Sequence, residues 1–372
     1  MIEPFEKPIP ISRPVLPLLG DFVNELEDVW ESKWITNLWK KHQLLEEKLR
    51  EELEVPYLSL MNNGTTALMI AFKILGLEGE VITTPFTFPA TVHALSWEGI
   101  EPVFCDIDPV TMNIDPNKIE ELITPKTTAI LPVHVFGIPC DMDRIQEIAD
   151  KHGLKVVYDA AHAFGVEVNG ESIGNFGDIT MFSFHPAKLF HTVEGGAISF
   201  KDPAHKEKAD FMRNFGIKNS DEVVVEGING KMNEMQASMG LLVLKMIEEE
   251  RRKRKILLDT YVQHLEDIPG VSFCLTGSDV VDSYQFFVVR IDESAFGRSR
   301  DYVYEKFKEY NVFTRKYFYP LCSQYPHYKD LPSAQGLKVA EQIAGEVLSF
   351  PYYGEVTVDD VVKICNILKS FR

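Results

Sequence analysis

The chain has 372 residues, 45% of them hydrophobic, which is enough for one large domain and a second, smaller one. It carries 38 basic and 56 acidic residues, and the formal charge of −18 argues against nucleic acid or an anionic membrane surface as a partner. No run reaches the roughly 18 apolar residues of a membrane-spanning helix, and residues 1–22 lack the pattern of a cleaved leader, so we expect a cytoplasmic protein.

Between about residues 60 and 200, short β-rich runs alternate with helical patterns, which is typical of a mainly parallel sheet covered by helices. The predicted strands are rich in branched or aromatic residues and span 80–85, 102–108, 128–135, 155–162, 178–184 and 196–200. The helices predicted between them span 67–75, 115–123 and 141–152, with Gly153 as a helix end. This part is therefore expected to be an α/β domain.

From Asn233 to about Leu265 the pattern predicts one long helix that links two domains. The elements predicted after it are strands at 271–274 and 284–291 and helices at 299–310, 337–350 and 358–371. We expect a large α/β domain at 1–245 and a smaller α+β domain at 246–372. The five cysteines are scattered without the spacing of a zinc site or a disulfide framework, so we predict no metal.

Asp159 and Lys188 are the two residues that most strongly suggest chemistry. Asp159 ends a predicted strand, where ligands bind in open parallel sheets, although a lone aspartate there more often caps a turn. Twenty-nine residues later, Lys188 follows the next strand in an otherwise apolar segment. Desolvation there would lower the pKa of its amine, as a Schiff-base lysine requires, whereas a snorkelling lysine is the ordinary alternative.

Two further features suit a phosphate and a planar ring. The turn Gly64-Thr65-Thr66 leads into a helix whose first N–H groups and hydroxyls could hold a phosphate, although simple capping would also explain it. Ser183 could add a hydroxyl. Phe88 could stack on a ring or lie in the core.

Pyridoxal 5′-phosphate needs these four supports together, namely an amine, an acid for its ring nitrogen, phosphate donors and a stacking ring. All four occur in one predicted domain, so we predict this cofactor. Asp159 would keep the ring nitrogen protonated, and Lys188 would be the catalytic base that moves a proton between the substrate Cα and the cofactor. A nicotinamide dehydrogenase is disfavoured because no G-x-G-x-x-G follows a first strand.

The segments NNGTTAL, FTFPAT, PVFCDIDPVTMNIDP, YDAAHAFG, FSFHPAKLFHTVEGGAI and GINGKMNEMQASMG closely resemble the DegT-type nucleotide-sugar aminotransferases, from about Trp30 to the C-terminus. This resemblance implies fold type I of the pyridoxal-phosphate transferases: an α/β domain with a mainly parallel, mixed sheet of the seven-stranded type sandwiched by helices, and a smaller α+β domain. It implies that the cofactor contacts Gly64, Thr65, Thr66, Phe88, Asp159, His162, Ser183, Lys188 and Asn229.

The resemblance also implies individual roles. His162 would lie beside the phenolic oxygen of the cofactor, at a position where many relatives carry Gln. Asn229 would reach the phosphate from the neighbouring subunit, so a homodimer with shared active sites is expected. Lys231 stands where many relatives have Arg. The implied substrate contacts are Asn37, Trp39, His185, Arg315 and Tyr317.

Relatives with His in place of the lysine remove a sugar hydroxyl, so Lys188 favours transamination. The implied reaction moves an amino group from an amino acid, L-glutamate first, to carbon 4 of dTDP-4-keto-6-deoxyglucose and gives dTDP-4-amino-4,6-dideoxyglucose, a precursor for surface glycans such as O-antigen. A carbon-3 aminotransferase, a sugar dehydratase and a non-catalytic regulatory relative are the alternatives.

Overall fold

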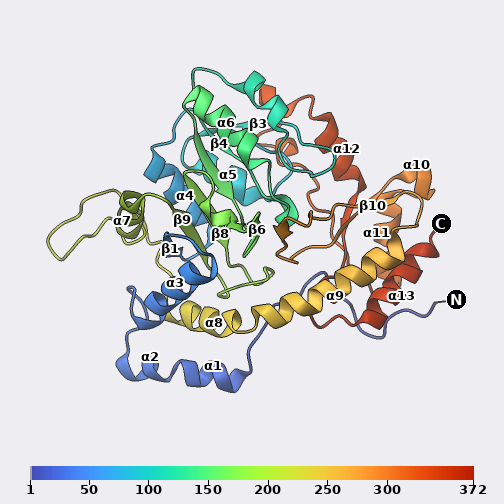
Figure 1. Ribbon diagram of the computed structural model, residues 1–372, viewed down its shortest axis with the longest axis horizontal. Helices are drawn as coiled ribbons and strands as arrows, with labels where there is room; N and C mark the ends of the chain where they lie inside the picture. The colour runs from blue at the N-terminus through green and yellow to red at the C-terminus, as the bar shows by residue number, and fades with distance from the viewer. Residues whose placement is uncertain (1) are drawn as a thin grey trace.

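A computed structural model describes residues 2–372 and is built around a seven-stranded mixed sheet (Figure 1). The strand order is β1-β9-β8-β5-β4-β2-β3. In chain order these strands are β1 (Tyr57–Met61), β2 (Glu80–Thr83), β3 (Glu101–Phe104), β4 (Thr127–Leu131), β5 (Lys155–Asp159), β8 (Ile179–Ser183) and β9 (Gly196–Phe200). Only β9 runs antiparallel to its neighbours, and all other adjacent pairs are parallel.

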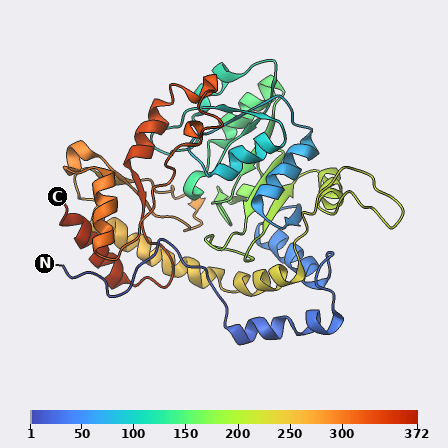
Figure 2. The ribbon, with the colours of Figure 1, turned by 180° about the vertical axis from the view of Figure 1, so that it is seen from behind.

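Helices cover both faces of this sheet, as Figures 1 and 2 show from opposite sides. One face packs on α4 (Gly64–Leu75), α5 (Pro89–Trp97) and α7 (Pro203–Met212), and the other on α3 (Lys40–Glu52), α6 (Met142–His152) and α8 (Glu234–Leu244). The strands alternate between the two cores: Val156 and Tyr158 belong to one, whereas Val157 belongs to the other. The strands are therefore apolar on both faces, as expected for a covered parallel sheet.

The C-terminal part packs against a long helix, α9 (Ile247–Leu265), and has a core of its own. Its three-stranded antiparallel sheet contains β10 (Val271–Phe273), β12 (Val288–Ile291) and β13 (Val347–Ser349), with α10 (Glu293–Phe296), α11 (Arg300–Glu309), α12 (Lys338–Glu346) and α13 (Val358–Lys369) around it. A small ribbon of β6 (Glu167–Val168), β7 (Glu171–Ser172) and β11 (Val280–Val281) and two N-terminal helices, α1 (Leu19–Glu25) and α2 (Glu27–Ser32), complete the fold.

We propose that the domain boundary lies between α8 and α9, near residue 245. The first residues of the chain are an exception, because Phe5 belongs to the C-terminal core and Ile9 forms a β-bridge with Val312. Among residues 2–372, no helix is long and apolar enough to cross a membrane.

The six predicted central strands are confirmed, and three other predictions are wrong in detail. The segment 115–123 forms only two 3-10 turns, and Pro125 disfavours helical backbone in the residue that follows this segment. The predicted long helix is broken at Lys245–Met246 into α8 and α9. The end of the predicted helix 337–350 is strand β13, where Val347 and Leu348 pair with β12.

Gly196 lets the sheet approach the turn before α4. A Cβ on this residue would lie 2.8 Å from the backbone of Asn63 and of Gly64, closer than real side chains come. Gly196 is also paired with Met61 on one side and Ser183 on the other, so the turn, the glycine and the serine lie in one row across the sheet. The position of the turn therefore depends on this missing side chain.

We expect Gly196→Ala to lower the free energy of unfolding by roughly 1–3 kcal/mol, the usual cost of overpacking, because backbone has to move to make room. Gly345→Ala in α12 is the control, since nothing lies within 4 Å of the added Cβ, and alanine there should be neutral or stabilising by up to about 1 kcal/mol. Urea unfolding of both variants measures the difference. Equal stability of the two variants would contradict the close approach.

Candidate active site

One cavity of about 350 Å³ opens where β5 and β8 end and α4 and α5 begin. Because β1, β5 and β8 run in the same direction, their carboxyl ends share one edge of the sheet. Ten of the predicted site residues line this cavity: Gly64, Thr65, Phe88, Asp159, His162, Ser183, His185, Lys188, Arg315 and Tyr317. The fold thus brings most of the predicted chemistry to one place.

The N-terminus of α4 forms one wall of the cavity. Asn63 caps the helix, its side chain accepting a hydrogen bond from the N–H of Thr66 at 2.8 Å. Gly64 and Thr65, the first two residues of the helix, line the cavity. The N–H groups at a helix start favour the binding of an anion. Ser183 lies beside them, since a Cβ on Gly64 would be 3.3 Å from Ser183 Oγ. These groups fit a phosphate.

Asp159 lies fully buried at the floor of the cavity with its carboxylate held in place. Oδ2 accepts a hydrogen bond from Thr91 Oγ1 at 2.8 Å, and Oδ1 accepts one from the N–H of Ala161 at 3.0 Å. Burial raises the pKa of Asp159, while these two hydrogen bonds and nearby Lys188 counter that rise. A fixed, buried carboxylate is suited to bind a protonated ring nitrogen. That cation would pair with the carboxylate and offset the cost of its burial.

Lys188 is a half-buried lysine that lines the cavity wall. Among residues 2–372 no hydrogen bond or ion pair engages its Nζ, which lies 5.8 Å from the ring centre of Phe286. Burial lowers the pKa of Lys188 from 10.5 to about 8, with Asp159 raising it and Arg315 lowering it further. The amine therefore reaches its neutral, nucleophilic form more readily than an exposed lysine does.

The tautomer of His162 follows from its surroundings. Its Nδ1 accepts a hydrogen bond from the N–H of Phe136 at 3.1 Å, and the ring lies parallel to Phe318 at 5.9 Å. Burial, and then the charge of Lys188, hold the pKa of His162 well below 6.5. A neutral imidazole that accepts at Nδ1 carries its proton on Nε2, so this residue offers an N–H donor to the cavity.

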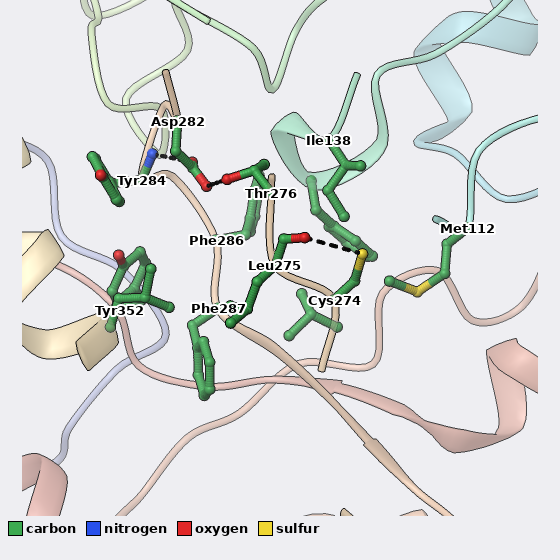
Figure 3. A pocket seen from close by; sticks show the side chains of 13 residues that line it. Met112, Ile138, Cys274, Leu275, Thr276, Asp282, Tyr284, Phe286, Phe287 and Tyr352 are labelled. Carbon is green, nitrogen blue, oxygen red and sulfur yellow. Dashed lines mark hydrogen bonds between the residues drawn. The ribbon is translucent and has the colours of Figure 1, made fainter. Parts of the chain in front are cut away.

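Phe88 and Phe286 are the aromatic walls. Phe88 is the N-cap residue of α5 and stays 49% exposed, which is unusual for a phenylalanine within a cavity and fits a ring that a planar ligand would cover. Phe286 also borders a second cavity, which Figure 3 shows beside Cys274 and Asp282. That cavity measures about 30 Å³, room for one or two waters, so it is no alternative ligand site.

Charged and polar groups lie together at the cavity mouth. Arg315 lies 4.6 Å from the ring centre of Tyr317 and makes no ion pair among residues 2–372. His185 Nε2 is 3.9 Å from Glu194 Oε1, and burial lowers the pKa of this histidine. A cation without an acid partner suits a carboxylate or a diphosphate.

Four predicted site residues do not line the cavity of their own chain. The N–H of Thr66 donates its hydrogen bond to the capping side chain of Asn63. Asn229 lies exposed at the base of the loop that follows α7. Asn37 and Trp39 lie in a turn against α8, where the N–H of Trp39 donates to Glu234 Oε1 at 2.9 Å. Their roles remain predictions.

Several cavity residues were not anticipated from the sequence. Thr91 could have been found, because Thr87 and Thr91 are four residues apart at a helix start and therefore share one face. Phe286 and Phe318 carried no comparable signal, since they come from the C-terminal part and meet the cavity only through the tertiary fold.

Taken together, the residues present fit pyridoxal phosphate. The helix start with Ser183 would hold its phosphate, Asp159 its ring nitrogen and Lys188 its aldehyde carbon, with Phe88 on the ring and His162 beside the phenolic oxygen. Each of these protein groups complements the part of the cofactor that it would contact in charge or in hydrogen-bonding capacity.

Comparison with known proteins shows a close match. Residues 19–369 match the DegT/DnrJ/EryC1/StrS aminotransferase family. A dTDP-4-amino-4,6-dideoxy-D-glucose transaminase of Escherichia coli is 45% identical over 368 residues, 98% of each chain, and one of Shigella dysenteriae is 44% identical over 99% of this chain and 100% of its own. The crystal structure of DesI in the presence of its TDP-sugar product has a TM-score of 0.94 and 34% identity, covering 99% of this chain and 94% of that one.

We expect Lys188 in the cofactor-free protein to titrate with a pKa of about 8. Because Asp159 raises this pKa and Arg315 lowers it, Asp159→Asn should shift the titration to lower pH and Arg315→Met to higher pH. NMR of lysine-labelled protein, with the resonance assigned from Lys188→Met, follows the titration. A midpoint at the ordinary lysine value would show that the amine is hydrated.

Proposed function

The chain belongs to the DegT/DnrJ/EryC1/StrS aminotransferase family, and from this membership we propose that it is a pyridoxal-phosphate enzyme that aminates carbon 4 of dTDP-4-keto-6-deoxyglucose. The amino donor is an amino acid, with L-glutamate the first candidate. The product is dTDP-4-amino-4,6-dideoxyglucose. The two transaminases with 44–45% identity over nearly the whole chain support this choice of sugar and carbon.

The observation that carries the reaction type is the presence of the half-buried Lys188 and the buried Asp159 in one cavity. When bound, pyridoxal phosphate supplies the electron sink for the amino transfer. Asp159, held by Thr91 and Ala161, keeps the ring nitrogen protonated. Lys188, with its pKa near 8, can both accept and return a proton at the reacting carbon close to neutral pH.

The apolar cavity walls complement these two groups. Phe88, Phe286 and Phe318 line the same cavity and limit the access of water to the reacting carbon. The open side carries Arg315, whose guanidinium is placed to receive an anionic group of either substrate. A lysine-dependent transfer is therefore favoured over a reaction in which water is the nucleophile.

We propose further that the enzyme works as a homodimer with shared active sites. The arm, defined as residues 214–228 after α7, projects from the body in both ribbon views (Figures 1 and 2). It exposes apolar side chains, including Val223 at 70% and Val224 at 48%, as does the N-terminal segment with Leu18 and Leu19, each at 76%. Surfaces of this kind suit burial against a second copy, and Asn229 stands at the root of the arm.

The cytoplasm is the proposed location of this reaction. All five cysteines are free thiols, and four of them are buried. Unpaired thiols are typical of proteins kept in a reducing compartment.

We expect the protein with pyridoxal phosphate to show a yellow chromophore that L-glutamate bleaches and dTDP-4-keto-6-deoxyglucose restores, with the new amine on carbon 4 by NMR. Lys188→Ala should lose this chromophore and slow turnover by at least roughly 10²–10⁴-fold, the range of a general base. Lys155→Ala is the control, because that lysine pairs with Asp178 on the surface. An amine on carbon 3 would refute the regiochemistry, and a chromophore retained without Lys188 would refute the lysine's role.

Mixed dimers test the shared site. Lys188→Ala and Asn229→Asp chains are each expected to be defective alone, the second because a carboxylate would repel the phosphate. In dimers formed by mixing the two in equal amounts, one site in the mixed species would combine a native Lys188 with a native Asn229. Half of the dimers are mixed, so activity should return to roughly a quarter of the wild-type value. No recovery would show that Asn229 does not act across the interface.

A further inference from the structure

Lys231 makes an unusual set of contacts next to Asn229. Its Nζ donates a hydrogen bond to Asn229 Oδ1 at 2.8 Å and lies 4.6 Å from the ring centre of Phe215. Among residues 2–372 no carboxylate pairs with it, although the chain carries 56 acidic residues. Partial burial lowers the pKa of this lysine. An ammonium in this protein thus faces an amide and an aromatic ring in place of an acid.

The chemistry of the two groups fixes how the amide of Asn229 is turned. An ammonium group donates hydrogen bonds and accepts none, so the atom that it contacts has to be the amide oxygen. The NH₂ group of Asn229 then points away from Lys231 and is free to donate. A phosphate accepts hydrogen bonds only, so this orientation suits it and the reversed one would set oxygen against oxygen.

The backbone at this point is fixed by other contacts. The N–H of Gly230 donates to Arg213 O at 2.9 Å, and the N–H of Asn62 donates to Gly230 O at 2.8 Å. Asn62 Nδ2 also donates to Asn229 O at 3.2 Å. These bonds hold the main chain of Asn229 but leave its side chain free to rotate. Within residues 2–372, Lys231 makes the only hydrogen bond to the side chain of Asn229, and this bond restricts its rotation.

We propose that Lys231 is a positioning residue that holds the Asn229 amide with its NH₂ group toward the phosphate of the cofactor bound in the partner subunit. This inference rests on the proposed function, specifically on the shared active site. The ring of Phe215, which belongs to the arm, also contacts the ammonium. Cofactor retention therefore depends on a lysine that does not itself need to touch the cofactor.

The experiment compares the affinity of the cofactor-free full-length protein for pyridoxal phosphate and for pyridoxal, which lacks the phosphate. We expect Lys231→Met to weaken pyridoxal phosphate binding by roughly tenfold or more, the value of a hydrogen bond to a charged group, and to leave pyridoxal binding unchanged. Lys231→Arg should restore most of the affinity, since it can donate to the same oxygen. Lys218→Met is the matched control on the arm, because that lysine pairs with Glu222.

A double-mutant cycle with Asn229→Ala separates the possible outcomes. If Lys231 acts through the amide, Lys231→Met should add little once Asn229→Ala is present. Full additivity, or an equal loss of pyridoxal and pyridoxal phosphate binding, would overturn the inference while leaving the proposed function intact. A raised KM for the nucleotide sugar with unchanged cofactor affinity would also overturn it, since the lysine would then contact substrate. Failure of the wild-type protein to bind either cofactor form would instead refute the proposed function.

Discussion

The site depends on the removal of one amine from water. Lys188 is half-buried in the cavity wall, and the net drop of its pKa to about 8 corresponds to a cost on the order of 3 kcal/mol for its charged form. This net cost already includes the attraction of Asp159, a carboxylate that is itself buried and held by Thr91 and Ala161. Two desolvated groups of opposite charge thus face one cavity, and a cationic ring with an electrophilic carbon satisfies both of them.

The sheet topology explains why these groups meet. β8 lies between β5 and β9, and β9 pairs with β1, so Asp159, Ser183 and the turn after β1 come from nearly adjacent strands. Strands are spaced about 4.8 Å apart, so the distance from the acid to the phosphate turn is set by the sheet and not by flexible loops. Gly196 is essential here, because its missing side chain lets the turn close on the sheet. A rigid scaffold therefore sets the separation between the groups at the two ends of the cofactor.

The sequence predicted the central domain well because its signals are local. Branched runs that end in a turn identify strands one at a time, and the order Asp159, Ser183, Lys188 followed from where those strands end. Trp39 and Asn229 could be proposed only from family resemblance, and neither lines its own chain's cavity. Phe318 was missed, because no local pattern shows which C-terminal ring will lie parallel to His162. Contacts between distant segments depend on packing and carry no periodic signature.

In the proposed dimer, the arm would contribute to both subunits. Its root is hydrogen-bonded to Asn62, the residue just before the cap of α4, so the root of the arm is tied directly to the phosphate turn of its own chain. In a shared site, the cofactor of one subunit contacts its own turn and the partner's Asn229. Any ligand that binds the dimer more tightly than the monomer stabilises the dimer by mass action. In the proposed dimer, cofactor occupancy and subunit association would therefore be thermodynamically coupled, and Lys231 would contribute to that coupling through its hydrogen bond to Asn229.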